Sequence, residues 1–252
     1  MTAHTQRAHA RLAPSSSKRF MMCPGSIRMS EGIPNTSTRF ADEGTAAHTL
    51  ADHCLKTGFD ADRFADWFVN LDLWVPAQKF VVASNGPRCH EIDAEMVDGV
   101  QTYLDYVREI MISPGVEFEV EQWLSLEYLG VPGLDGGTGD VVAYHPETQM
   151  LDVVDLKYGR GIPVEPKENT QGLCYALGAI RRYHNRGIKK LRITIVQPRC
   201  PHPAGPIRTW EADVIDLLDF EADLKQAALR TIRATDESDG SLPTTPDWGT
   251  LY

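Results

Sequence analysis

The sequence predicts a single α/β domain. Its 252 residues are enough for one sizeable hydrophobic core, and no internal repeat divides them. Apolar residues recur at helical spacing over 91–113 and 166–184, whereas β-branched and aromatic residues dominate 116–121, 140–145 and 151–157. Three expected strands therefore lie between two expected helices, an order typical of a sheet with helices packed against it.

Residues 1–13 are polar and basic and show no periodicity. We expect this segment to be flexible and the folded domain to span 14–252. Within the domain, 15–24 predicts a capped short helix that Pro24 stops.

A longer helix is expected from Glu43 to near Gly58, because glycine favours the C-terminal cap of a helix. His48 lies beside its apolar stripe. A histidine in such a place is either a satisfied core residue or a ligand. Residues 59–90 predict no regular element.

The helix at 91–113 is followed by a strand that alternates cleanly over 116–121. The alternation places Glu117, Glu119 and Glu121 on one face. Glu121 comes closest to the Gly-rich connection that follows, so we expect it to face a site. The alternative is that all three glutamates are solvated on an exposed face.

Two further strands form a hairpin, with Pro146–Gln149 as the turn. Asp140 begins the first strand, and Asp155 and Lys157 share one face of the second. Charges buried near one another require pairing or a metal. Two carboxylates beside a lysine favour a divalent cation and phosphate chemistry, and the alternative is a surface hairpin with a solvated ion pair.

The helix expected at 166–184 places Gln171 and Tyr175 four residues apart on a common side. A β-rich run follows at 191–197, then a short edge strand at 207–210 and a closing amphipathic helix at 212–234.

A net charge of -10 argues against a protein that coats nucleic acid through its overall charge. A local basic strip nevertheless contains Arg181, Arg182, Lys189 and Lys190 without an acidic residue between them. These residues either bind a phosphate backbone or are solvated around a helix end and turn. No run is long and apolar enough to cross a membrane, and the N-terminus lacks the apolar core of a secretory signal, so we expect a cytoplasmic protein.

Five short motifs occur in a set order on these elements. Together they resemble the PD-(D/E)XK nuclease superfamily, and within it the RecB-like nucleases and phage exonucleases of the lambda type. The motifs are the Ser-rich, Cys-Pro segment Ser15–Pro24, Gly44-Thr-Ala-Ala-His48, Gly137-Thr-Gly-Asp140, Asp155-Leu-Lys157 and Gln171-Gly-Leu-Cys-Tyr175. Each motif alone is weak, but their order is specific.

The resemblance implies a restriction-endonuclease-like core with a central mixed β-sheet flanked by helices. It also implies one or two Mg²⁺ or Mn²⁺ ions, held by Asp140, Asp155 and the backbone carbonyl of Leu156. His48 would approach the metal, and Glu121 is a further candidate ligand. Lys157 would orient the attacking water and offset phosphate charge.

Gln171 and Tyr175 would, on the same resemblance, fix water and the DNA backbone; otherwise they are an ordinary packed helix face. Several relatives bind an iron-sulfur cluster through one early and three late cysteines. Here only Cys23 and Cys200 could be placed that way, so we expect no cluster.

The resulting hypothesis is a metal-dependent deoxyribonuclease, an exonuclease of phage or prophage recombination or DNA repair that leaves 5' phosphates. The alternatives are a DNA-binding or scaffold protein that keeps the nuclease fold without catalysis, and an endonuclease that uses the same site. DNA is the expected partner. A single-strand annealing protein or a helicase, and a toroidal oligomer, are compatible with the resemblance.

Overall fold

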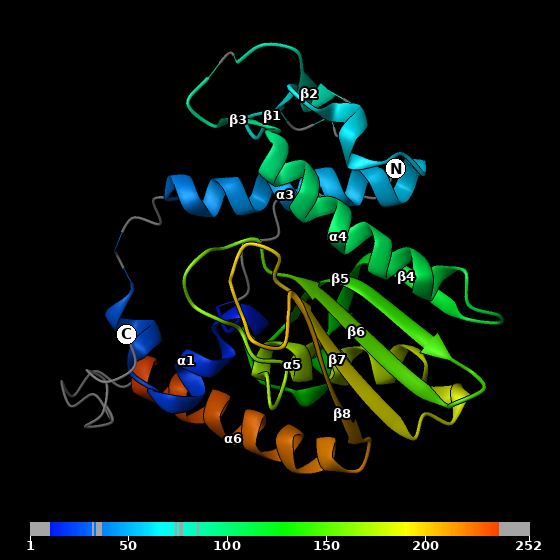
Figure 1. Cartoon of the computed structure of the whole chain (residues 1–252). Coiled ribbons are helices and arrows are strands. Elements are labelled where there is room, and N and C mark those ends of the chain that lie inside the picture. The colour runs from blue at the N-terminus through cyan, green and yellow to red at the C-terminus, as the bar shows by residue number, and fades with distance from the viewer. Residues whose placement is uncertain are drawn as a thin grey trace.

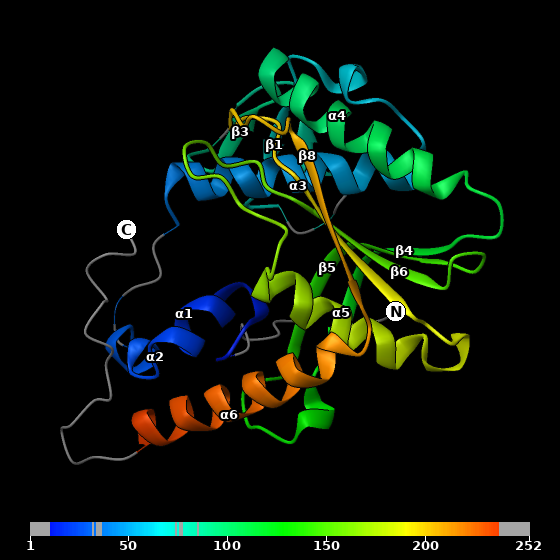
Figure 2. The same ribbon diagram turned by 60° about the horizontal axis from the view of Figure 1, so that its bottom comes forward.

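The computed structural model describes residues 11–31, 33, 37–73, 75, 78–84 and 86–236. A five-stranded sheet lies between two layers of helices (Figures 1 and 2). The helices are α1 Ser17–Met22, α2 Ser26–Met29, α3 Arg39–Thr57, α4 Ala94–Met111, α5 Thr170–Arg182 and α6 Asp216–Asp236. The strands are β1 Phe68–Asn70, β2 Phe80–Val81, β3 Cys89–Glu91, β4 Glu117–Ser125, β5 Gly136–His145, β6 Met150–Leu156, β7 Lys190–Val196 and β8 Ile207–Asp213.

The main sheet is mixed, which confirms the expected fold class. Its strand order is β4-β5-β6-β7-β8, and only β6 and β7 run parallel. Parallel neighbours need a crossover, and α5 supplies it between β6 and β7. Because β5 and β6 are antiparallel, the first half of β5 lies beside the end of β6, and the start of α5 meets them there.

Each face of the sheet carries its own apolar core. On the α5 side, Val142 and Leu151 pack with residues of α1, α5 and α6. On the other side, Val141 and Val154 pack with the apolar stripes of α3 and α4. The sheet is thus buried on both faces, as expected of a sheet flanked by helices.

Several expected elements are present with shifted ends. The short helix α1 ends at Met22, before Pro24, and α3 ends at Gly58 in a left-handed cap. Helix α6 starts at Asp216 because β8 extends to Asp213, beyond the expected edge strand. No helix in the described part of the chain is both long and apolar enough to cross a membrane.

The expected flexible segment 1–13 lies mostly outside the described residues, but its last residues are packed. The side chain of Leu12 is fully buried in the core on the α5 side, and its N–H donates to the Gly133 carbonyl at 2.9 Å. The packed part of the chain therefore includes Leu12, whose burial offsets the loss of backbone freedom.

Residues 59–90, which predict no regular element, contain a second small sheet. Its order is β2-β1-β3, with antiparallel pairing throughout. Phe64 and Phe80 pack against His53 of α3, with ring centroids 5.2 and 4.6 Å from the imidazole. Strands of two or three residues are too short to show a period in the sequence.

The expectation that Glu117, Glu119 and Glu121 share one face is wrong. Glu121 has a left-handed backbone, with φ 52°, and the ladder passes from Val120↔Val141 to Gln122↔Gly139 without a pair at Glu121. The break reverses the alternation of β4. Glu119 consequently binds Arg182 of α5, whereas Glu121 lies beside His48 of α3.

Helix α5 lies unusually close to the sheet. A Cβ added at Gly178 would stand 2.8 Å from Leu124 Cβ and 3.0 Å from its carbonyl carbon, and one at Gly172 would stand 2.8 Å from Ile193. Only glycine permits this approach, which brings the start of α5 to the end of β6 and the neighbouring first half of β5.

We expect Gly178→Ala to lower the free energy of unfolding by about 1–3 kcal/mol, because the new methyl group overlaps the backbone of β4. Urea unfolding followed by circular dichroism would measure this. The control is Gly44→Ala on α3, which has open space and is expected to be neutral or to stabilise by about 0.5–1 kcal/mol. If both variants unfold alike, the close packing of α5 is not required.

Candidate active site

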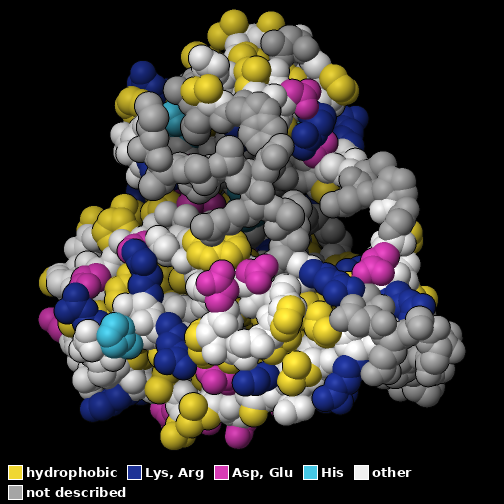
Figure 3. Space-filling view, turned by 180° about the vertical axis from the view of Figure 1, so that it is seen from behind, with side chains coloured by type: hydrophobic (Ala, Val, Ile, Leu, Met, Phe, Trp, Pro, Cys, Tyr) yellow, Lys and Arg dark blue, Asp and Glu magenta, His cyan; other side chains and the backbone are white. Residues whose placement is uncertain are grey.

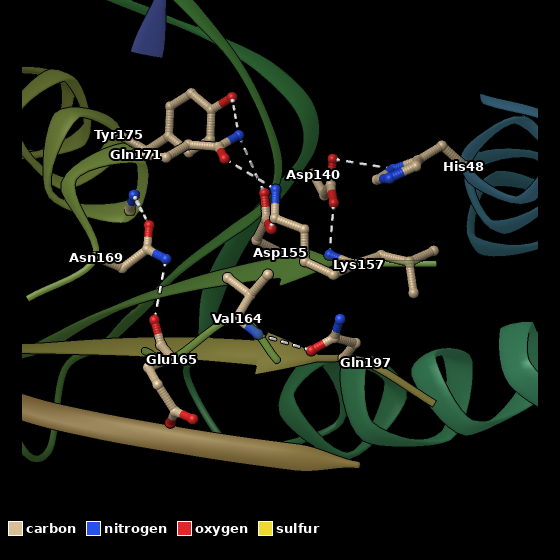
Figure 4. A network of polar contacts seen from close by, with 12 residues as sticks. His48, Asp140, Asp155, Lys157, Val164, Glu165, Asn169, Gln171, Tyr175 and Gln197 are labelled. Atoms are coloured by element: carbon tan, nitrogen blue, oxygen red, sulfur yellow. Dashed lines mark hydrogen bonds and ion pairs between the residues drawn. The ribbon is translucent and has the colours of Figure 1, made fainter. Parts of the chain in front are cut away.

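Polar side chains from four elements meet where β5 and β6 stop pairing. Asp140 comes from β5, Asp155 from β6, and Lys157 follows β6 directly. His48 enters from α3 on one side, and Gln171 with Tyr175 from α5 on the other (Figure 4). The structure therefore brings together residues from four of the five sequence motifs.

Asp140 takes the place of a backbone partner for β6. The last β5–β6 pair on this side is Val141↔Val154, and beyond it the Leu156 N–H donates to Asp140 Oδ2 at 2.7 Å. The N–H and C=O of one strand residue point to the same side. The Leu156 carbonyl is thus directed toward the Asp140 side of β6, as required of the expected backbone ligand.

A chain of polar contacts links Asp155 to α5. Asp155 Oδ2 lies 2.7 Å from Lys157 Nζ, which donates to Gln171 Oε1 at 2.9 Å. The Gln171 amide donates to the Tyr175 hydroxyl at 3.1 Å and lies 3.5 Å from Asp155 Oδ1. Gln171 thereby fixes the positions of both the lysine and the acid.

The start of α5 is itself held in place. The Asn169 side chain caps the helix by accepting the Gly172 N–H at 3.0 Å. The Ser17 hydroxyl donates to Thr170 Oγ1 at 2.7 Å, which ties α1 to the same turn. The first turn of α5, and with it Gln171, is therefore fixed from two sides.

One group of three residues could hold a metal ion. Ligand atoms of His48, Glu121 and Asp140 lie within 4.8 Å of one another. Asp155 lies beside Asp140 (Figure 4), and its Oδ2 is paired with Lys157 Nζ at 2.7 Å. These carboxylates, with one imidazole, suit Mn²⁺ and admit Mg²⁺, which prefers oxygen ligands.

The charges of this cluster are strongly coupled. Burial acts against the charged form of His48, but the Asp140 carboxylate outweighs it and raises the pKa of His48 to about 9. Burial together with the charge of Asp140 raises the pKa of Glu121 to about 7. For Asp140, burial is outweighed by His48 and the Leu156 N–H, so its pKa is lowered.

Asp155 behaves differently from Asp140. Burial raises the pKa of Asp155 above its usual value, although the adjacent Lys157 acts in the opposite direction. The pKa of Lys157 is raised in turn, since the Asp155 carboxylate outweighs the effect of burial. A further positive charge beside Asp155 would therefore favour its ionised form.

Two buried residues, neither of which the sequence motifs include, hold the segment after Lys157. Gln197 Oε1 accepts the Val164 N–H at 2.9 Å, and its amide donates to the Ile162 carbonyl at 2.9 Å. Arg208 donates to Gln197 and to the Val164 carbonyl, at 2.7 and 2.9 Å. Gln197 is a polar residue directly after the apolar strand sequence that ends at Val196. That position is the sequence feature that could have suggested a role for it.

The expected DNA-binding strip does not reach the site. Lys189 and Lys190 lie at the start of β7, whereas Val196, at its other end, pairs with Leu156, so the separation is about 20 Å. Arg181 stacks over Tyr128, and Arg182 pairs with Glu119. These side chains are engaged at the C-terminal end of α5, away from Gln171.

The fold and this cluster define an α/β protein with a buried acidic site suited to a divalent cation. A family model matches residues 9–240, and the chain belongs to that family, which is described as "Protein of unknown function (DUF2800)". The chain is also similar to the crystal structure of a phage related exonuclease from Haemophilus somnus 129PT, at 13% identity and a TM-score of 0.31. That likeness covers 88% of this chain and 93% of the other, but at this TM-score it is too weak to show a shared fold or activity.

We expect Glu121→Gln to weaken Mn²⁺ binding about tenfold or more. Substitution of residues that only hydrogen-bond to metal ligands already lowers metal affinity about 10–100-fold. Isothermal titration of Mn²⁺ into the purified protein would measure it. The matched control is Glu119→Gln, two residues away on the opposite face of β4, which should leave the affinity unchanged. Equal effects of the two substitutions would contradict the reversed alternation at Glu121.

Proposed function

We propose that this protein is a metal-dependent DNA nuclease with a PD-(D/E)XK-type active site. The observation that carries the proposal is the convergence of Asp140, Asp155 and Lys157 at one edge of the mixed sheet. Their contacts link the two hairpin strands, and Leu156 between them offers its carbonyl toward the same side. The sequence resemblance to RecB-like nucleases assigns these same positions to phosphodiester hydrolysis.

The cost of the cluster supports a functional role. The Asp155 side chain is 6% exposed and that of Asp140 is 14% exposed, so both carboxylates are largely removed from water. Replacing a buried ion pair with well-packed apolar residues is often neutral or stabilising. Burying several charges together therefore lowers the stability of the fold. A catalytic role would explain why the chain keeps them.

A divalent ion bound by Asp140, Asp155 and Leu156, with His48 and Glu121 as further ligands, would lower the pKa of a bound water and offset charge on the phosphate. The protein residues perform the remaining tasks. Asp140 is fixed by the Leu156 N–H, so its carboxylate does not need to reorganise when substrate binds.

We assign to Lys157 the roles of orienting the attacking water and offsetting the negative charge of the phosphate. Its ammonium is held between Asp155 and Gln171, which sets its position before substrate arrives. Gln171 and Tyr175 position this group and offer an amide and a hydroxyl to water or to the DNA backbone. A preorganised positive charge of this kind is most effective at a partly dehydrated site.

From the resemblance, we further propose exonuclease action that leaves 5' phosphates, in phage or prophage recombination or DNA repair. An endonuclease would use the same residues, and a binding or scaffold protein would use none of them for catalysis. Cleavage of linear and closed circular DNA separates these possibilities.

We expect Lys157→Ala to reduce cleavage of end-labelled linear DNA by about 10²–10³-fold in Mn²⁺ or Mg²⁺, because one charge-stabilising group is lost. Mn²⁺ binding should be retained, since Lys157 is not a ligand. Lys225→Ala, an exposed lysine on α6, is the charge-matched control and should cleave normally. Chelation by EDTA should stop the reaction.

Three outcomes of this assay are informative. Loss of linear DNA alone supports an exonuclease, and cutting of circles supports an endonuclease. If the unsubstituted protein binds DNA but cleaves neither form with either metal, the catalytic proposal is wrong.

A further inference from the structure

A cleft of about 380 Å³ opens beside the candidate metal ligands. It lies between α3 and the small β1–β3 sheet, and its lining includes both His48 and Glu121. At its other end it is lined by Lys56 of α3 and by Lys79 and Phe80 at the start of β2. The cleft is therefore continuous with the candidate active site, but it reaches well beyond it.

The length of the cleft matches a short stretch of nucleic acid. His48 and Lys56 are eight positions apart on one helix, which corresponds to roughly 12 Å along its axis. A nucleic-acid strand carries one phosphate per roughly 3.4 Å of helix axis, and fewer when it is extended. Lys56 and Lys79 thus lie within a few nucleotides of a phosphate held at the metal ligands.

Two lysines and one aspartate, Asp52, line the far end of the cleft. Lys56 pairs with Asp52 one helical turn earlier on α3. No hydrogen bond or ion pair of the Lys79 side chain with another described residue is present. Lys79 is only partly exposed, and it lines the cleft, where an anion could reach it.

One wall of the cleft is aromatic. The rings of His53 and Phe80 are in tilted contact, with centroids 4.6 Å apart, and both residues line the cleft. Phe64 packs behind them, with its centroid 4.9 Å from that of Phe80. Aromatic surfaces next to lysines are the combination that binds single-stranded nucleic acid, because bases stack while phosphates pair with the cations.

The view from behind shows how the charged side chains are distributed on that face of the molecule (Figure 3). Lysine and arginine side chains are interspersed there with aspartate and glutamate rather than gathered into one basic face (Figure 3). With a net charge of -10, the chain needs a local site to attract a polyanion. The cleft supplies one next to the candidate catalytic residues.

We propose that this cleft is a nucleotide subsite for a single DNA strand that enters or leaves the candidate active site. Lys79 contacts a backbone phosphate, and Phe80 with His53 forms the wall against which a base lies. The subsite deepens the proposed nuclease function and rests on it. It also assigns a role to the small β1–β3 sheet, which supplies Lys79 and Phe80.

The test is fluorescence anisotropy of a labelled single-stranded oligonucleotide in EDTA, at several salt concentrations. We expect Lys79→Ala to weaken binding several-fold and to reduce the slope of log affinity against log salt by about 0.7, the value for one lost phosphate contact on a single strand. Lys79→Arg keeps the charge and should retain binding. Lys225→Ala on α6 should behave as the unsubstituted protein.

The results separate failure of the subsite from failure of the nuclease proposal. Unchanged binding in Lys79→Ala, or no binding by the unsubstituted protein, overturns the subsite even if metal-dependent cleavage is observed. Weakened binding in Lys190→Ala but not in Lys79→Ala would assign the strand to the strip at the start of β7 and also overturn the proposal. Lys79-dependent binding without any cleavage would support the cleft and contradict catalysis.

Discussion

The hydrogen bond from the Leu156 N–H to Asp140 is the contact on which the candidate site depends. It forms where the β5–β6 ladder ends, and it replaces a backbone bond that β6 would otherwise need. Satisfying that N–H with a carboxylate brings a negative charge to the sheet edge, where His48, Glu121 and Asp155 add titratable groups. This one hydrogen bond therefore both completes the pairing of β6 and positions the charge of Asp140 in the site.

Two backbone features make the surrounding arrangement possible. The left-handed backbone at Glu121, in the middle of β4, places the Glu121 side chain beside His48 and Asp140, on the face of β4 opposite to Glu119. On the other face, Gly172 and Gly178 allow α5 to lie against the sheet, and this places Gln171 at Lys157. The site is thus assembled from both faces of one sheet, at the edge where the parallel crossover begins.

Much of this could be predicted from sequence because strand alternation is a local property. The period of β6 places Asp155 and Lys157 on one face, and the structure has them in contact. The reversal at Glu121 depends on a single backbone dihedral that leaves no trace in the pattern of residues. The sequence also does not show that Lys190 lies far from the site, because the direction of β7 relative to the site depends on the tertiary fold.

If the buried acids hold a divalent cation, anomalous scattering from a crystal grown with Mn²⁺ should locate the ion. We expect a peak within about 2.6 Å of oxygens of Asp140 and Asp155 and of the Leu156 carbonyl. The same map would show whether His48 and Glu121 complete the coordination. A peak elsewhere, or none at a saturating concentration with the Asp155–Lys157 pair undisturbed, would show that these acids do not bind the ion and would leave the cluster as a structural ion-pair network.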